Sequence, residues 1–147
     1  MSDATLCGVF AVKLPVRDLA RSSAWYERVF DLRLRFEFPD ADGTVRGRAY
    51  EVSGLGDVGL ALRERPDLAG LSGFDPVIFA VPDRAAVDAW VARLGALGVP
   101  HDVQEGTLGW VVQFHDPDGL EIHLYSREPH GIDAAGRAGT GRAVVTA

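Results

Sequence analysis

The fold of this chain is decided by residues 12–32, VKLPVRDLARSSAWYERVFDL, because much of this stretch recurs further along the sequence. A shift of 65 positions places it on residues 77–97, VIFAVPDRAAVDAWVARLGAL, with eight identities in 21 positions. Average residue usage predicts about one or two. Both segments run through an apolar strand, an aspartate in a helix N-cap position and an amphipathic helix. We therefore predict two tandem copies of one structural unit.

Each copy continues as a β-α-β-β-β pattern. Alternating or β-rich segments bounded by Gly, Pro and Asp turns predict the strands. In the first copy we expect strands and a helix over residues 8–16, 19–30 (helix), 32–38, 44–52 and 57–62. In the second copy the strands fall over residues 76–81, a short stretch at Val103, 108–114 and 120–125. After the first of them Asp83 caps a helix whose apolar face is Val87, Trp90, Val91 and Leu94. This predicts an α+β fold whose two units form a curved mixed sheet, a cup with the helices on its outer face.

The length of 147 residues fits one domain. We place that domain at residues 8–126, with units at 8–63 and 74–126. Residues 127–147 are rich in Gly, Ala and Arg without apolar periodicity, and we expect a flexible C-terminal tail there.

Composition limits the classes of partner. The net charge of −6, with no basic stripe to offset it, argues against a nucleic-acid partner. No apolar run approaches a membrane span, and the first residues lack the pattern of a signal peptide. The single cysteine, Cys7, is compatible with a reducing compartment. We expect a cytoplasmic protein that binds neither nucleic acid nor membrane.

Three segments carry a family resemblance: VKLPVRDL at 12–19, SSAWY at 22–26 and FHDPDGLEIHL at 114–124. In these the chain resembles the vicinal oxygen chelate superfamily, which includes glyoxalase I, extradiol dioxygenases, fosfomycin-resistance enzymes and bleomycin-resistance proteins. The resemblance implies the cup-shaped fold already predicted and a small-molecule ligand. It also implies a homodimer, because such proteins pair their units within or across chains.

Members of that superfamily typically hold a divalent metal with four inward-facing side chains. Residue by residue, those positions fall on Ala11, Pro76, the window Val58–Leu62 and His123. Of these only His123 is a metal-binding type, whereas a catalytic metal site needs about three protein ligands. We therefore expect no metal at the usual place. Relocated ligands would have to come from unexpected positions, such as Glu64, Glu121 or His115.

The last predicted strand supplies the candidate site. Strand side chains alternate, so Glu121, His123 and Tyr125 share one face, opposite the apolar residues of the strand. Histidine is the side chain best suited to general acid or base work near neutral pH, which makes His123 and Glu121 the candidate catalytic pair. Further candidate ligand contacts on other strands are Trp110, Arg48 and Tyr50. For Trp110 packing in the core is an equal alternative, and for Arg48 and Tyr50 simple exposure is the alternative.

The leading functional hypothesis is a metal-independent small-molecule-binding protein of the bleomycin-resistance type. Its ligand would be small and partly aromatic, such as an antibiotic. The alternative is a lyase, isomerase or dioxygenase with relocated metal ligands, or with metal-free catalysis by His123 and Glu121. A third class is a regulatory or assembly module. The absence of metal-binding residue types at Ala11, Pro76 and Val58–Leu62 favours binding.

Overall fold

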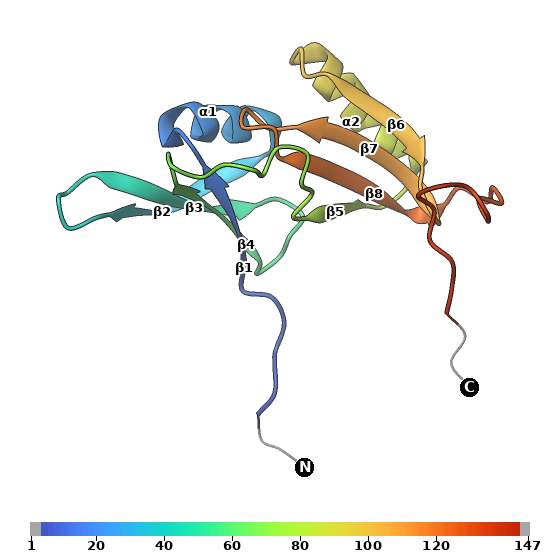
Figure 1. The fold of residues 1–147 in the computed structure, drawn as a ribbon, viewed down its shortest axis with the longest axis horizontal. Helices are drawn as coiled ribbons and strands as arrows, with labels where there is room; N and C mark the ends of the chain where they lie inside the picture. The colour runs from blue at the N-terminus through green and yellow to red at the C-terminus, as the bar shows by residue number, and fades with distance from the viewer. Residues whose placement is uncertain (1–3, 145–147) are drawn as a thin grey trace. The chain divides into compact units, whose positions relative to one another are not determined.

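The computed structural model describes residues 4–144 and divides the chain into two compact units, Met1–Leu71 and Ser72–Ala147. Each unit runs β-α-β-β-β along the chain (Figure 1). The two tandem units of an α+β fold are therefore confirmed. Neither helix of the described chain has the length and apolar character that crossing a bilayer requires.

The first unit is a mixed four-stranded sheet with one helix. Its strands lie in the order β1 (Ala11–Val16), β4 (Gly59–Glu64), β3 (Val45–Val52) and β2 (Leu32–Pro39). Strand β1 runs parallel to β4, and the other pairs are antiparallel. Helix α1 (Leu19–Val29) begins after Asp18, whose carboxylate accepts a hydrogen bond from the Arg21 amide at 3.0 Å. This cap is the one that the sequence predicts.

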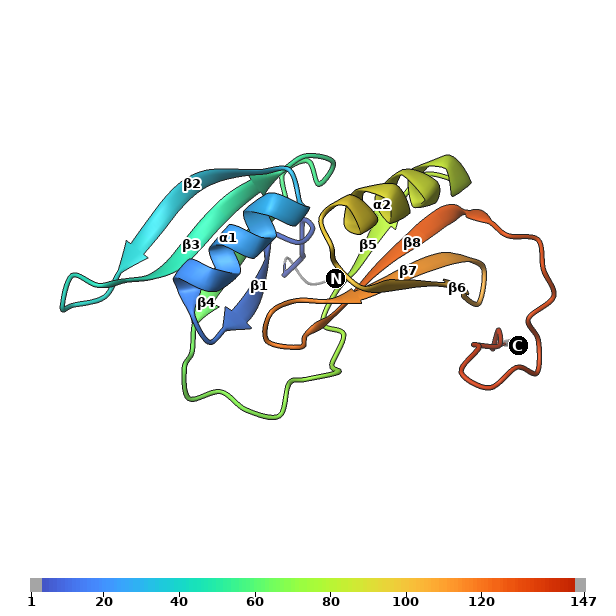
Figure 2. The ribbon, with the colours of Figure 1, turned by 90° about the horizontal axis from the view of Figure 1, so that it is seen from above.

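The second unit repeats this arrangement. Its strands lie in the order β5 (Ile78–Val81), β8 (Glu121–Pro129), β7 (Gly109–His115) and β6 (His101–Glu105). Strand β5 runs parallel to β8, as β1 does to β4. Helix α2 (Arg84–Ala96) is capped by Asp83 as predicted. Within each unit the helix lies along one face of the sheet (Figure 2).

Each unit packs its core between its helix and one face of its sheet. In the first unit, buried side chains on this side include Leu14, Val16, Tyr26, Val29, Leu60 and Leu62. In the second they include Val87, Leu94, Val112, Phe114, Ile122 and Leu124. Strand alternation sends the intervening residues to the opposite side, which we call the open face of each sheet.

A β-bulge in β2 changes which side chains reach the open face. The simple alternation of Leu32, Leu34, Phe36 and Phe38 predicts one shared face. The pairing with β3 shifts between Leu34, which lies opposite Tyr50, and Phe36, which lies opposite Ala49. Because a bulge inserts one residue, Phe36 and Phe38 turn to the open face while Leu34 stays on the helix side. The expectation of a single shared face is therefore wrong.

Strand β8 continues to Pro129, past the end expected at Tyr125. The next residue, His130, contacts the hairpin between β6 and β7: its amide donates to the Leu108 carbonyl at 3.0 Å, and its Nε2 lies 2.7 Å from the Gly106 carbonyl oxygen. Further on, Ala134 is buried. The tail expected at residues 127–147 therefore begins within β8. The flexibility of the tail stays a prediction.

Candidate functional site

The open face of the first sheet contains a hollow of about 900 Å³. All four strands of the unit contribute to its lining, together with the segments that precede β1 and β4. We call this site the hollow. Its side chains come from alternate positions, which include Lys13, Phe36, Phe38, Ala49 and Ala61.

The floor of the hollow is made of small residues. Ala49 on β3 lies directly opposite Ala61 on β4, and Ala61 lies opposite Lys13 on β1. Gly47 and Gly59 add no side chain at the neighbouring positions of the same face. Because side chains of directly opposed residues normally fill the space above a sheet, this run of Ala and Gly leaves room for a ligand.

The wall of the hollow is aromatic. Phe36 is 61% exposed and Phe38 is 48% exposed, and their ring centroids are 6.4 Å apart. Phe10, which precedes β1, is also exposed and belongs to the lining. Covering such apolar surface is favourable by about 25 cal/mol per Å². Clustered exposed aromatic side chains of this kind mark binding surfaces.

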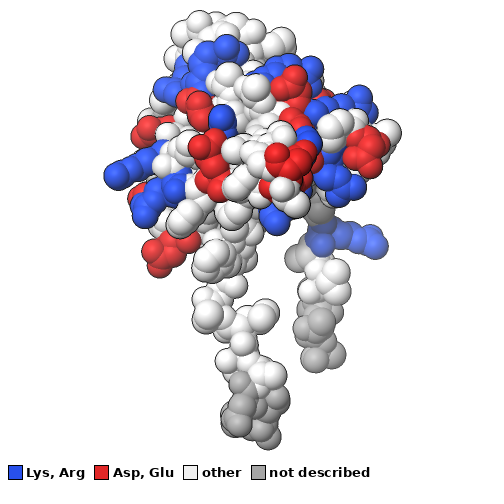
Figure 3. Space-filling view, turned by 90° about the vertical axis from the view of Figure 1, so that its left-hand side faces the viewer, with Lys and Arg blue, Asp and Glu red and all other residues white. Residues whose placement is uncertain are grey.

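The cations of the hollow differ in their partners. Arg35 pairs with Glu51 at 2.9 Å, and Arg63 pairs with Asp40 at 2.9 Å. On the face of the molecule seen in Figure 3, cationic and anionic side chains are interspersed in the same way. Lys13, in contrast, forms no ion pair with any residue of the described chain.

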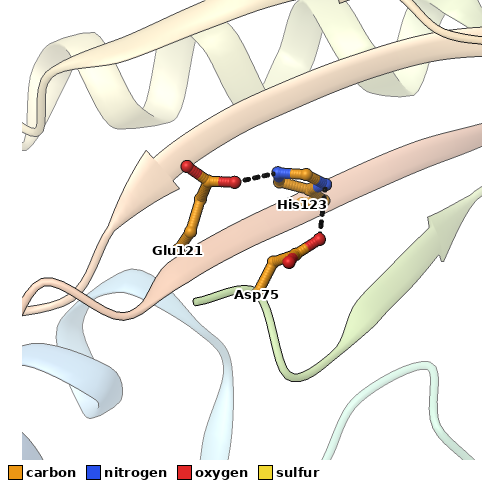
Figure 4. Close-up of side chains that lie close together, drawn as sticks. All are labelled: Asp75, Glu121 and His123. Carbon is orange, nitrogen blue, oxygen red and sulfur yellow. Dashed lines mark hydrogen bonds and ion pairs between the residues drawn. The ribbon is translucent and has the colours of Figure 1, made fainter. Parts of the chain in front are cut away.

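The open face of the second sheet is polar. As predicted, Ile122 and Leu124 of β8 are buried on the helix side, whereas Glu121 and His123 face the other way with side chains 19% exposed. Figure 4 shows His123 between Glu121 and Asp75. His123 Nε2 lies 2.8 Å from Glu121 Oε2, and His123 Nδ1 lies 3.7 Å from Asp75 Oδ2.

Glu121 is held by further side chains of β7. Gln113 donates from Nε2 to Glu121 Oε1 at 2.7 Å, and His115 Nε2 lies 3.5 Å from the same oxygen. Gln113 in turn accepts a hydrogen bond from Gln104 Nε2 at 3.0 Å. A histidine oriented by a fixed carboxylate is an arrangement that can transfer a proton to or from a bound molecule.

Tyr125 and Trp110, two other predicted ligand contacts, interact instead with residues of the second unit. The Tyr125 hydroxyl accepts a hydrogen bond from the Leu108 amide at 2.9 Å, so it supports the hairpin between β6 and β7. Trp110 lies under the first residue of α2, with the Arg84 guanidinium carbon 4.1 Å from its ring centroid. The ring of His130 meets Trp110 edge-on at 5.6 Å. Trp110 therefore belongs to the helix side of its sheet.

Arg48 and Tyr50 of β3 lie on the helix side of the first sheet. They stand opposite the core residues Leu62 and Leu60. Tyr50 is 2% exposed and donates to Glu27 Oε1 at 2.7 Å. Burial, reinforced by this hydrogen bond, raises the pKa of the Tyr50 hydroxyl.

Arg48 Nε lies 3.4 Å from Glu37 Oε2. Arg48 is not part of the lining of the hollow, whereas Tyr50 contributes to that lining from its buried position. Of the predicted site residues, the structure brings together Glu121 and His123.

The family model for the glyoxalase/bleomycin resistance protein/dioxygenase superfamily matches residues 8–124. The chain belongs to this superfamily. Its resemblance to the vicinal oxygen chelate proteins is thereby confirmed. No curated protein sequence matches the chain.

Several solved structures of the superfamily share the fold. TnmS3, an antibiotic-binding protein from Streptomyces sp. CB03234, is 26% identical, with a TM-score of 0.68 over 84% of this chain and 98% of that one. A glyoxylase/bleomycin resistance protein/dioxygenase domain from Frankia sp. EAN1pec is also 26% identical, with a TM-score of 0.64 over 83% and 98%. The fosfomycin resistance protein FosX from Listeria monocytogenes, complexed with Mn(II) and a dihydroxypropylphosphonic acid, is 19% identical, with a TM-score of 0.66 over 82% and 93%.

Strand register now tests the metal positions that the superfamily implies. In the first sheet Lys13 lies opposite Ala61, and in the second Ile78 lies opposite His123. Since the repeat superimposes Lys13 on Ile78, the residue that corresponds to His123 in the window Val58–Leu62 is Ala61. The usual positions are therefore Ala11, Ala61, Pro76 and His123, of which one carries a ligand atom. These residues do not fit a divalent metal.

A different set has the composition of a cation site. The ligand atoms of Asp75, Glu121 and His123 all lie within 4.8 Å of one another. Both ring nitrogens of His123 face a carboxylate, Nε2 toward Glu121 and Nδ1 toward Asp75. A shared ion would have to replace one of these contacts, because a ring nitrogen that donates its N–H to a carboxylate has no free lone pair for a metal.

Three features of the two open faces were missed or left aside in the sequence. Asp75 directly precedes Pro76, which the repeat aligns with Ala11, so it is next in the sequence to one of the usual metal positions. That adjacency was the signal available for Asp75. Lys13 is the one charged residue of an otherwise apolar strand. Phe36 and Phe38 had no usable signal, because a β-bulge leaves no distinct pattern in this strand.

Proposed function

We propose that the protein binds a small, partly aromatic molecule in the hollow of its first unit, without the metal that the superfamily usually holds. The hollow carries this proposal: a floor of Ala and Gly, an aromatic wall and a volume of about 900 Å³. Ligand sites of proteins are typically apolar clefts of about 300–1,000 Å³ with a few polar groups. The ligand class includes antibiotics.

Two further observations support binding over catalysis. The metal positions of the first unit are occupied by Ala11 and Ala61, which line the hollow and carry no ligand atom. TnmS3, which shares 26% identity and almost its whole length with this chain, is an antibiotic-binding protein. Fold alone does not decide between functions, so the argument depends on the residues of the hollow.

The test uses N-phenylnaphthylamine, an uncharged aromatic probe whose fluorescence rises in apolar surroundings. We expect saturable binding to the full chain and at least tenfold weaker binding to Ala61→Phe. Ala61 points into the centre of the hollow, so a phenyl ring there would occupy the ligand's space. Fluorescence titration gives both affinities, and a thermal melt of the variant shows that it is folded.

Asp133→Phe is the matched control, because it adds the same ring at an exposed site of the second unit. The probe should bind this variant as it binds the wild type. Equal affinity for Ala61→Phe and wild type would place the probe outside the hollow and contradict the proposal.

Metal-free or relocated-metal catalysis is the second candidate function. The contacts of His123 with Glu121 and Asp75 favour it, since an oriented imidazole with two carboxylates suits proton transfer or metal ligation. Dialysis against EDTA separates metal-independent binding from the form of the second candidate that uses a relocated metal. We expect no change in the affinity for N-phenylnaphthylamine, and a loss that Mn²⁺ restores would favour the enzyme.

We also propose that the chain forms a homodimer. Strands β2 and β6 each end the order of their sheet, so each has one edge unpaired within its own unit. Unpaired sheet edges tend to associate, and pairing of two copies is the commonest outcome. Light scattering of the purified full chain should give twice the mass of 15.8 kDa. A monomer mass at all concentrations would contradict this.

A further inference from the structure

We infer that the ligand of the hollow carries an acidic group, which pairs with the ammonium of Lys13. The inference rests on the proposed function, because it names the chemistry of the molecule that the hollow would hold. It adds a group that recognises anions to a site whose floor and wall are apolar.

The position of Lys13 places its charge inside the lining. Its neighbours in β1, Leu14 on one side and Val12 on the other, point to the helix side, so Lys13 points to the open face. It lies opposite Ala61, whose methyl group leaves the space beside the lysine stem unfilled. The phenyl rings of Phe36 and Phe38 line the same hollow.

The charges around Lys13 leave it without a counterion. The charged side chains of the lining are Lys13, Arg35, Arg63, Glu51 and Asp57. Arg35 is paired with Glu51, and Arg63 with Asp40. Asp57, in the turn before β4, forms no ion pair with Lys13. Of the three cations in the lining, Lys13 is therefore the one without a carboxylate partner in the described part of the chain.

Desolvation then determines which ligands fit. A molecule that packs on the aromatic wall displaces water from the ammonium of Lys13. An uncharged molecule offers the ammonium no acceptor in exchange for the water that it displaces, which is unfavourable. A carboxylate, sulfonate or phosphonate supplies the missing acceptor, and hydrogen bonds between ionised groups are about twice as strong as those between neutral ones. The hollow is therefore suited to an aromatic body with one acidic group.

The test compares two probes that share a ring system. Anilinonaphthalenesulfonate carries a sulfonate on the framework of the uncharged N-phenylnaphthylamine. We expect wild type to bind the sulfonate about tenfold more tightly, and Lys13→Gln to lose about tenfold or more of that affinity. The affinity of Lys13→Gln for the uncharged probe should stay within about twofold of wild type. Lys13→Arg should retain most of the preference.

Arg127→Gln is the control, because it removes one positive charge from an exposed position of the second unit. It should leave both affinities unchanged. The inference would be overturned if wild type and Lys13→Gln bound the sulfonate with equal affinity while Ala61→Phe still excluded both probes. The proposal that the hollow binds the ligand would then remain valid. A parallel loss of both probes in Lys13→Gln would also overturn the inference, since that pattern indicates a structural role. If Ala61→Phe affects neither probe, the proposed function itself fails.

Discussion

Replacing Ile122 with Ala is expected to lower the free energy of unfolding by about 2–5 kcal/mol. Ile122 is 1% exposed and lies opposite Phe114, on the face of β8 that packs toward α2. Truncation removes buried aliphatic surface and leaves a cavity that the surrounding strands cannot fully close. Urea denaturation followed by circular dichroism measures the change.

The adjacent residue provides the matched control. His123→Ala removes a side chain on the open face, so we expect a change within about 1 kcal/mol, the usual worth of a partly exposed hydrogen bond. The two sites are adjacent in the chain, and only their faces differ. If His123→Ala were the more damaging substitution, β8 would face the other way and the cluster of Glu121, His123 and Asp75 would not exist as described.

The topology could be predicted because the repeat and its caps are local signals. Asp18 and Asp83 each precede a helix, and each carboxylate accepts a hydrogen bond from a backbone amide in the first turn of that helix. The alternation in β8 was equally informative, since Ile122 and Leu124 are apolar and their neighbours polar. Where propensity, pattern and capping agree, sequence reasoning succeeds.

The site was harder to predict, for two physical reasons. Alternation shows which residues share a face but not which face the helix covers, and β3 has Arg48 and Tyr50 on the covered side. The register across strands is also not visible in the sequence. The bulge that turns Phe36 to the open face, and the proximity of Asp75 to His123, both follow from pairings with neighbouring strands.

The open faces also explain why one chain contains two different candidate sites. In the first unit the floor and wall of the open face are apolar, and Lys13 forms no ion pair there within the described part of the chain. In the second it is a network of polar side chains centred on Glu121. The repeat preserved the strands and helices, which need apolar periodicity, while the open-face positions were free to differ. Lys13 and Ile78, which the repeat superimposes, illustrate this difference.

The second large effect is expected at Gly109, the first residue of β7. A Cβ atom built there would overlap the backbone carbonyl oxygen of Ser126 and lie 2.7 Å from its hydroxyl. That hydroxyl accepts a hydrogen bond from the Trp110 amide at 2.9 Å and donates to the Glu128 carbonyl at 2.7 Å, so β8 is fixed against β7 at this point. Gly109→Ala should therefore separate the strands locally and destabilise the protein by about 1–3 kcal/mol.

Gly95→Ala tests whether this cost comes from the close approach rather than from the loss of a glycine. Gly95 lies within α2, and a Cβ atom there meets nothing within 4 Å. Alanine restricts the unfolded chain and favours the helix, so this variant should gain about 0.5–1 kcal/mol. Urea denaturation of both variants gives the two changes, which should have opposite signs. If Gly109→Ala were as stable as wild type, β7 and β8 would approach each other less closely in solution than the contact between Gly109 and Ser126 implies. The hairpin that Tyr125 and His130 support would then be placed differently.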